Sequence, residues 1–268
     1  MHADKLHVLN DIPPALEITS SLRKLMNKLK GTYMTNDGKG VDYSALRGSV
    51  MFQTYLLLTQ QLRTVDLNTL AEDEKKAFFL NVYNALTIHA IALSDTIPQS
   101  VLDLGNFWET ATYNIGGYGL SLDDIEHGIL RRNATHPVKK KIQFSPDDPR
   151  VELVIKHPDP RIHFALVCGG KSCPAISVYS AENLDEALKT AAKSYCQQEV
   201  NVDKEKKQVT MSKMFQWYIS DFAHTPQDLV RWVLPYLGSD QQDAASVLVS
   251  DPSLQVIYSD YNWQLNKI

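Results

Sequence analysis

The sequence predicts an α+β protein that is rich in helix and carries a small antiparallel sheet. Between residues 15 and 93, apolar residues recur at helical spacing, and further along the chain two pairs of short alternating segments flank turn residues. A hydrophobic content of 44% with 22% charged residues is ordinary for a globular protein with a sizeable core. We therefore expect a single domain, 1–268, with a helical part at about 15–93 and a thiol-containing α+β part at about 94–268.

Charge and cysteine content limit the class of protein. The net charge of −4 gives no reason to expect nucleic acid or an anionic membrane as a partner, and no run of apolar residues is long enough for a membrane span. The first residues lack the pattern of a signal peptide. Three cysteines make a disulfide framework unexpected, so we expect a cytoplasmic protein. The helical pattern begins soon after Met1, as expected for a piece of a longer chain.

Three helices are expected in the first part, at 15–30, 43–62 and 72–93. The third has apolar residues on nearly every face, which predicts burial on all sides. Asn81 and Asn84 lie inside it, and buried amides must find hydrogen-bond partners. We interpret them as braces that tie loops to the helix. The alternative is that one of them orients a catalytic group.

The second part mixes short elements. Ala111–Ile115 and Tyr118–Leu120 are expected to form a hairpin, and Ser121 with Asp124 forms a capping box for the next helix. Residues 132–150 show no periodicity and are expected to form a loop, of a length that is often a functional lid. The later elements are expected as a strand or helical turn at 151–155, a strand at 162–167, a helix at 180–196, a hairpin of 200–202 with 208–211, a helix or turn at 215–222, helices at 226–237 and 241–249, and a strand at 256–263.

The stretch 159–176 carries two of the three cysteines. Cys173 follows a Gly-Gly-Lys-Ser turn and precedes a helix-like segment, whose N–H groups would favour a thiolate; Lys171 adds positive charge. We predict that Cys173 is a nucleophile, with backbone N–H groups of residues 169–173 as donors to an oxyanion. Cys168 is the competitor, but a cysteine that ends an apolar strand is more often a core residue.

Three histidines are candidates for the general base. His163 lies on the strand that enters the turn, His127 follows Glu126 in the short helix, and His89 lies in the buried helix. Glu126 and His127 are adjacent in sequence and do not share a helix face. A histidine on an apolar element is usually a hydrogen-bonded core group, so the choice among the three stays open.

A metal site was weighed against the thiol enzyme. Cys168, Cys173, His163 and His127 would supply a Cys₂His₂ set for zinc, but their spacing matches no standard pattern. The two cysteines are also too far apart for the usual CxxC redox motif, and no GxSxG serine motif occurs. We expect neither a metal nor a cofactor.

Several motifs carry a family resemblance: Phe78-Phe-Leu-Asn-Val-Tyr-Asn-Ala85, Leu122-Asp-Asp-Ile-Glu-His-Gly-Ile-Leu-Arg131, Asp159-Pro-Arg-Ile-His-Phe-Ala-Leu166, Ser172-Cys-Pro174, Ser212-Lys-Met-Phe-Gln-Trp-Tyr218 and Tyr261-Asn-Trp263. In this order they resemble the domain-of-unknown-function 547 family over about residues 45–265. That family looks related to papain-like and transglutaminase-like cysteine enzymes. Its animal members are similar to the C-terminal part of larger proteins with DEP and glutaredoxin-like domains, and its plant members can follow a leucine-zipper segment.

The resemblance implies a papain-like or transglutaminase-like fold and a thiol hydrolase or acyl transferase that acts on an amide or isopeptide bond of a protein or peptide. Cys173 would be the nucleophile, with His163 or His127 as base and Asn81 or Glu126 as orienting group. The motif positions that carry over are Asn81, Asn84, Glu126, His127, Arg131, Arg161, His163, Cys168, Ser172 and Cys173, with Gly169 and Gly170 beside them. The residues expected to bind are Asn84, Arg131, Arg161, Gly169, Gly170 and Ser172. The strong histidine candidates precede the cysteines, which implies a permuted or degenerate site. The alternative function is a non-catalytic interaction module of a larger glutaredoxin/DEP-type protein.

Overall fold

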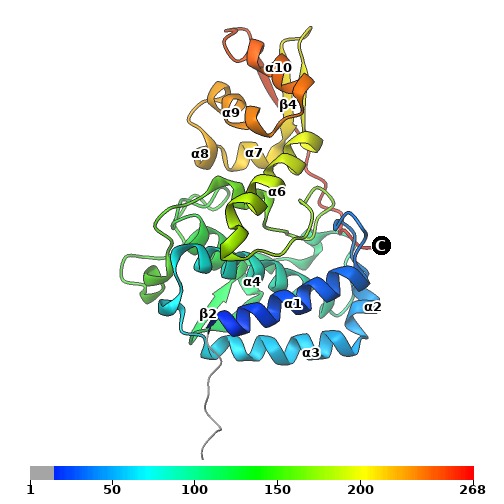
Figure 1. The fold of residues 1–268 in the computed structure, drawn as a ribbon, viewed down its shortest axis with the longest axis vertical. Coiled ribbons are helices and arrows are strands. Elements are labelled where there is room, and N and C mark those ends of the chain that lie inside the picture. Colours follow the sequence, from blue (N-terminus) through cyan, green and yellow to red (C-terminus); the bar gives the residue numbers. More distant parts are fainter. Residues whose placement is uncertain (1–14) are drawn as a thin grey trace, which may run out of the picture.

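The computed structural model describes residues 15–268, and its helices and small sheets confirm the α+β class (Figure 1). Residues 1–14, where a signal pattern was not expected, lie outside the described residues. The first part consists of α1 (Ala15–Tyr33), α2 (Tyr43–Arg47), α3 (Val50–Thr59) and α4 (Glu72–Ala92). Helices α1 and α3 run side by side, and α1 and α2 also pack on α4. Within residues 15–268, no helix has both the length and the hydropathy to cross a membrane.

Helix α4 is the buried element on which the site is built. Apolar residues lie on all of its faces, residues 76–88 are buried without interruption, and Phe78 and Phe79 are completely buried. The amide of Asn81 bonds the backbone N–H and C=O of Tyr179, at 2.9 and 2.7 Å. Asn84 bonds the C=O of Ala165 and the N–H of Val167 in the same way, at 2.9 Å each. Both amides therefore have the hydrogen bonds expected of a brace.

A hairpin leads into the next element. Strands β1 (Thr112–Ile115) and β2 (Tyr118–Ser121) pair antiparallel, as predicted. Ser121 and Asp124 then accept each other's backbone N–H, at 3.1 and 2.9 Å, which confirms the capping box. The helix that follows, Asp124–Leu130, is a π-helix, which we label η4. π-Helical turns are rare and frequently mark functional sites.

The last part of the chain forms a second layer with its own apolar cluster, above the first in Figure 1. It contains α6 (Leu184–Glu199), β3 (Val200–Asp203), β4 (Gln208–Ser212), α7 (Lys213–Trp217), α8 (Ile219–Phe222), α9 (Pro226–Val233), α10 (Ser239–Leu248) and β5 (Gln255–Ser259). The sheet order is β3-β4-β5. The β3–β4 hairpin was predicted, but β4 and β5 pair in parallel, so the expectation of a purely antiparallel sheet is wrong.

The strand expected at 162–167 is also wrong. Asp159 accepts the N–H of Arg161 at 2.9 Å and Pro160 occupies the first turn, so the chain winds into a 3₁₀-helix, Pro160–Phe164. The apolar residues after it are extended, but their backbone groups bond the side chain of Asn84 instead of a neighbouring strand. His163 of the 3₁₀-helix lines the same pocket as Leu166 and Cys168.

Two helix predictions fail for local reasons. The helix expected at 43–62 is broken because Ser49 caps a new helix, with its Oγ accepting the N–H of Phe52 at 3.0 Å. No helix begins after Cys173, since the chain runs without regular structure until the 3₁₀-turn at 181–183 and α6. The shorter elements that complete the chain are α5 (Phe107–Thr110) and 3₁₀-helices at Gln60–Thr64, Leu67–Thr69, Val101–Leu104, Pro149–Leu153, Ala181–Asn183 and Leu234–Tyr236.

Candidate functional site

A pocket of about 390 Å³ opens where the two layers meet. One wall is aromatic, with Trp108, Trp217, Tyr218, Tyr261 and Trp263. The rest carries polar groups. Four of them were predicted from the sequence, namely Glu126, His127, His163 and Cys168, and they are joined by Asp123, His136 and Lys139. An apolar cavity with a few convergent polar and titratable groups is the usual form of a ligand or active site.

The two cysteines form a close pair of thiols. Their sulfurs lie 2.7 Å apart, and the Cys173 sulfur also accepts the backbone N–H of Cys168 at 3.2 Å. The Tyr261 hydroxyl lies 3.1 Å from the Cys173 sulfur and 3.5 Å from that of Cys168. Cys173 is buried, whereas Cys168 is partly exposed and lines the pocket. The sulfur in reach of a ligand is therefore that of Cys168.

The protonation of the pair is uneven. Burial alone would raise the pKa of Cys173, but hydrogen bonds from Cys168, Tyr261 and backbone N–H groups lower it to about 7. The hydrogen bond to Cys173, together with burial, raises the pKa of Cys168 well above its ordinary value. Above about pH 7 the pair therefore holds one proton, on Cys168, and a negative charge on Cys173.

The backbone donors predicted for an oxyanion are already engaged. The N–H groups of Lys171 and Ser172 donate to the carbonyls of Gln264 and Asn262, at 2.9 and 3.3 Å. The N–H of Cys173 donates to the carbonyl of Gly170 at 3.1 Å. The first two bonds fasten the turn to the C-terminal segment and the third closes the turn, so the prediction that residues 169–173 form the oxyanion hole does not hold for residues 171–173.

His163 is oriented by a carboxylate that the sequence analysis did not single out. Its Nε2 lies 2.8 Å from Oδ2 of Asp221, and its ring stacks on Tyr218 with centroids 3.9 Å apart. A carboxylate only accepts hydrogen bonds, so Nε2 carries the proton and Nδ1 keeps its lone pair when the ring is neutral. His163 can therefore act as a base through Nδ1. Within residues 15–268, no hydrogen bond joins a histidine to either pocket thiol.

Arg131 holds Asp221 in place. Its Nε and Nη2 donate to the two carboxylate oxygens at 2.5 and 2.8 Å. Burial would raise the pKa of Asp221, but hydrogen bonds from Arg131 and His163 lower it far below the ordinary value. Arg131, predicted as a binding residue, thus fixes the partner of His163.

His127 has the same tautomer as His163, but its Nδ1 lone pair is already occupied. Arg131 Nη1 lies 2.8 Å from its Nδ1, and a guanidinium only donates, so Nδ1 accepts and Nε2 carries the proton. Burial lowers the pKa of His127 to about 4, so the ring is neutral at pH 7. A neutral imidazole with its lone pair occupied is a hydrogen-bond donor, not a proton acceptor.

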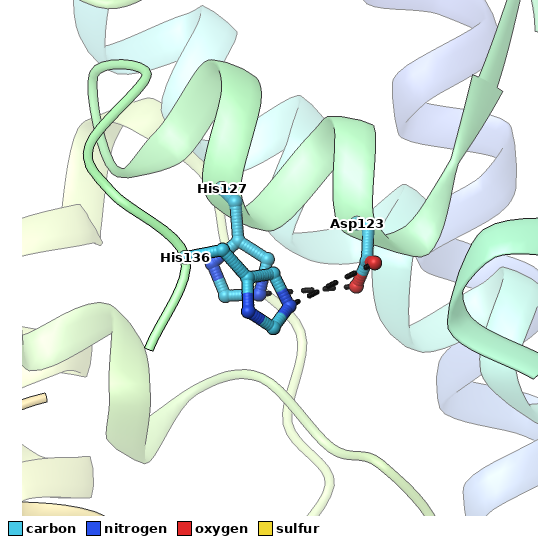
Figure 2. A group of neighbouring side chains, drawn as sticks. All are labelled: Asp123, His127 and His136. Atoms are coloured by element: carbon cyan, nitrogen blue, oxygen red, sulfur yellow. Dashed lines mark ion pairs between the residues drawn. The ribbon is translucent and has the colours of Figure 1, made fainter. Parts of the chain in front are cut away.

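Figure 2 shows His127 beside Asp123 and His136, whose ligand atoms all lie within 4.8 Å of one another. His136 Nδ1 accepts the backbone N–H groups of Val138 and Lys139, at 3.0 and 3.1 Å. Its Nε2 therefore also carries a proton, and both Nε2 atoms lie 3.8 Å from Asp123.

These tautomers do not fit a metal ion. A metal bound at Nε2 needs the lone pair there and the proton on Nδ1, which then donates outward. Both imidazoles of this cluster have the reverse arrangement, and the ammonium of Lys139 already contacts Asp123. The Cys₂His₂ set for zinc that the sequence offered is not brought together either. Among residues 15–268, only Asp123, His127 and His136 place three possible metal-ligand atoms close to one another.

Glu126 supports the aromatic wall of the site. Its carboxylate accepts the hydroxyls of Tyr83 and Tyr218, at 3.0 and 2.6 Å. Burial opposes the charge, but the imidazoles of His127 and His163, the Tyr218 hydroxyl and Arg131 keep the pKa of Glu126 below its ordinary value. Glu126 thus fixes Tyr218, on which His163 stacks, and makes no hydrogen bond to either imidazole.

The remaining candidates do not line the pocket. His89 bonds the hydroxyl of Tyr113 at 2.6 Å within an aromatic cluster, and burial lowers its pKa to about 4. Arg161 pairs with Asp159 and Asp185. Ser172 accepts the N–H of Asn262 at 2.9 Å, so it fastens the C-terminal segment. The pocket residues that sequence reasoning missed are Asp123, His136, Lys139 and the phenol of Tyr261, together with Asp221 behind His163.

The stability of the protein in acid should depend on the charge of Asp123, at the centre of this cluster. Burial opposes its charge, but hydrogen bonds from His136 and Lys139 lower its pKa to about 2. Because the pKa of Asp123 is lower in the folded than in the unfolded protein, its charge stabilises the fold fully above about pH 4. This contribution is lost as the pH falls towards about 2. We expect Asp123→Asn to lower the free energy of unfolding by about 2 kcal/mol at pH 7, and urea titrations should show this gap closing between about pH 4 and 2.

The exposed Asp260, whose side chain is 97% accessible, provides the matched control. Asp260→Asn should give the same unfolding curve as the wild type at every pH. A gap between wild type and Asp123→Asn that stays constant down to about pH 2 would contradict a charged, paired carboxylate at position 123.

Comparison with known proteins gives a match of part of the chain to a family model. No curated protein and no solved structure matches the chain. Residues 67–196, slightly less than half of the chain, match the family model described as "Protein of unknown function, DUF547". The matched segment runs from the 3₁₀-turn before α4 through η4 and both cysteines into the last turn of α6. It includes Glu126, His127 and His163, whereas Asp221 and Tyr261 lie outside it.

Proposed function

We propose that the protein is a thiol-dependent hydrolase or acyl transferase that acts on an amide or isopeptide bond of a protein or peptide. The supporting observation is the thiol pair, whose Cys168 lines the same pocket as His163, and the hydrogen bond by which Asp221 orients that imidazole. The proposal extends the papain-like and transglutaminase-like resemblance to this site, where a thiol, an imidazole and a carboxylate recur in a different chain order. The aromatic wall would bind an apolar part of the substrate.

In the first half-reaction, the Cys168 sulfur attacks the carbonyl carbon, because it is the accessible thiol. Its proton passes to the thiolate of Cys173 while the new S–C bond forms and the carbonyl electron pair moves to oxygen. His127 donates its Nε2–H to that oxygen, in place of the engaged backbone amides. When the C–N bond breaks, the leaving nitrogen takes the proton from Cys173, which becomes a thiolate again.

The second half-reaction releases the acyl group. His163 takes a proton at Nδ1 from an incoming water or amine, which attacks the thioester carbon. The S–C bond breaks, and the Cys168 sulfur recovers a proton from His163. Asp221 stabilises the imidazolium in between and keeps Nε2 protonated throughout. In this scheme Cys173 is the proton carrier of Cys168, which reverses the roles that the sequence predicted for the two thiols.

Alkylation tests the assignment of the thiols. With iodoacetamide and peptide mapping, Cys168 should react well before Cys173, at a rate that rises through about pH 7. Cys173→Ser removes the proton carrier, so the midpoint for Cys168 should move up to the ordinary thiol value of about 8.5 or higher. Cys196→Ser, a change at a buried thiol outside the pocket, should leave the profile unchanged. Alkylation of Cys173 first, or an unmoved midpoint in Cys173→Ser, would contradict the assignment.

Acyl chemistry needs its own readout. A nitrophenyl acyl ester should give a burst of nitrophenol and an acyl adduct on Cys168 that mass spectrometry detects. In His163→Gln the adduct should still form but persist, because the group that activates water is missing. If the alkylation profile is as predicted but no acyl adduct forms on Cys168, the protein is not an acyl enzyme. If His163→Gln loses the adduct as rapidly as the wild type, His163 does not activate the water.

A further inference from the structure

We propose that Cys168 and Cys173 are a redox modification site, which a low-molecular-weight disulfide converts into an intramolecular disulfide. This goes beyond the proposed acyl chemistry and does not depend on it, since it needs only the two thiols. The cysteines are five positions apart and lack the CxxC redox spacing, but the fold brings them together in space. Their sulfurs lie 2.7 Å apart, so the bond can close with a small movement of the side chains.

The turn between the cysteines is shaped to bring the sulfurs together. Gly169 has a φ of 90°, a conformation that favours glycine, and a Cβ there would lie 2.6 Å from the Ile91 side chain. The turn is then fixed from outside, because Lys171 and Ser172 donate to the C-terminal segment and Asn266 donates to the carbonyl of Gly169 at 2.8 Å. The geometry of the thiol pair is thus already ordered in the reduced protein, and closing the disulfide restricts few further groups.

The two sulfurs have complementary parts in the exchange. Cys168 lines the pocket and is the sulfur that an incoming disulfide can reach, whereas Cys173 is buried directly behind it. The charge that Tyr261 and the backbone stabilise on Cys173 makes it a ready attacking group at neutral pH. This division into an exposed and a buried thiol is typical of a dithiol in which one cysteine reacts and the other resolves.

The reaction balances without any further reagent. Cys168 passes its proton to the Cys173 thiolate as its sulfur attacks one sulfur of the disulfide RSSR. A mixed disulfide forms, and the released RS⁻ takes that proton from Cys173, which becomes a thiolate again. The Cys173 thiolate then attacks the Cys168 sulfur, and a second RS⁻ leaves. The protein dithiol is oxidised by two electrons, and RSSR is reduced to RSH and RS⁻.

Oxidation should be visible in the aromatic wall. The Tyr261 hydroxyl lies 3.1 Å from the Cys173 sulfur, so a disulfide removes its thiolate acceptor. The Tyr261 ring packs on Trp263 and Trp217, with centroids 4.7 and 5.3 Å apart. We therefore expect the intrinsic tryptophan fluorescence to change when the disulfide forms and to recover with dithiothreitol.

The test is incubation of the full chain with oxidised glutathione, followed by acid quenching and mass spectrometry. The wild type should lose the mass of two hydrogens, with Cys168 and Cys173 linked in one peptide and Cys196 still reduced. Cys173→Ser should instead stop at a stable glutathione adduct on Cys168, and Cys168→Ser should react far more slowly because its remaining pocket thiol is buried. The fluorescence change should accompany the linked species alone.

Tyr261→Phe keeps the sulfurs together but removes one donor to the thiolate. It should still form the linkage, at a lower rate at pH 7 than the wild type. A wild-type protein that stays reduced, or that accumulates the mixed disulfide at Cys168 without resolving it, would overturn the proposal. Equal reactivity of Cys196 would also overturn it, since the change would then be general thiol oxidation.

Discussion

Arg131→Met is expected to lower the free energy of unfolding by about 3–5 kcal/mol, because it leaves a largely buried carboxylate without its main partner. The Arg131 side chain is 1% exposed and that of Asp221 is 16% exposed. Two guanidinium hydrogen bonds, at 2.5 and 2.8 Å, satisfy that carboxylate, and methionine keeps most of the volume without donating any. Urea unfolding at pH 7 measures the loss.

The effect should depend on the charge of Asp221. Asp221→Asn alone leaves the guanidinium unpaired, but the double variant removes both charges, and its loss should be well below the sum of the two single losses. Arg231→Met is the matched control, because Arg231 is 52% exposed and pairs with Asp228 at the surface, where we expect about 0–1 kcal/mol. Additive single losses in the double variant would show that Arg131 stabilises the fold through packing and not through Asp221.

The sequence predicted the elements that depend on local patterns. Helix α4 follows from a continuous apolar pattern behind an acidic first turn, and the start of η4 follows from the reciprocal bonds of Ser121 and Asp124. The hairpins β1–β2 and β3–β4 follow from alternation around turn residues. In each case the residues that decide the structure are near one another in the chain.

The strand at 162–167 failed because an apolar run reports burial and not geometry. Its residues are buried on all sides, which is equally true of a buried strand and of a 3₁₀-helix followed by an extended segment. What decided the outcome was the Asp159-Pro160 start and the side chain of Asn84, which lies 81 residues away from Ala165 in sequence and takes the place of a neighbouring strand.

The site was only half predictable for a related reason. Spacing and residue type identified Cys168, Cys173, His163 and His127, but their chemical roles depend on distant partners. Asp221 is 58 residues from His163, and Tyr261 is 93 residues from Cys168. Which nitrogen of an imidazole carries the proton follows from donors such as Arg131, and no sequence pattern contains that information.

Gly128→Ala is expected to destabilise the protein by about 1–3 kcal/mol and to loosen the loop over the pocket. Gly128 lies in η4 directly after His127, and an added Cβ would lie 2.4 Å from the ring of Phe144. Phe144 is fully buried and cannot retreat easily, because the side chain of Asn133 bonds its N–H and its C=O at 2.8 Å each. The ring therefore has to move together with its loop.

That loop carries His136 and Lys139 to Asp123, so its displacement should reach the pocket. Urea unfolding measures the stability, and amide hydrogen exchange at Val138 and Lys139, whose N–H groups bond His136, measures the loop. Gly31→Ala is the matched control, since Gly31 lies in α1 with nothing within 4 Å of its would-be Cβ, and we expect it to be neutral or stabilising by up to about 1 kcal/mol. If Gly128→Ala lowered stability while exchange at residues 138 and 139 stayed unchanged, the contact of Phe144 with Gly128 would be a packing contact alone and would not hold the loop on the site.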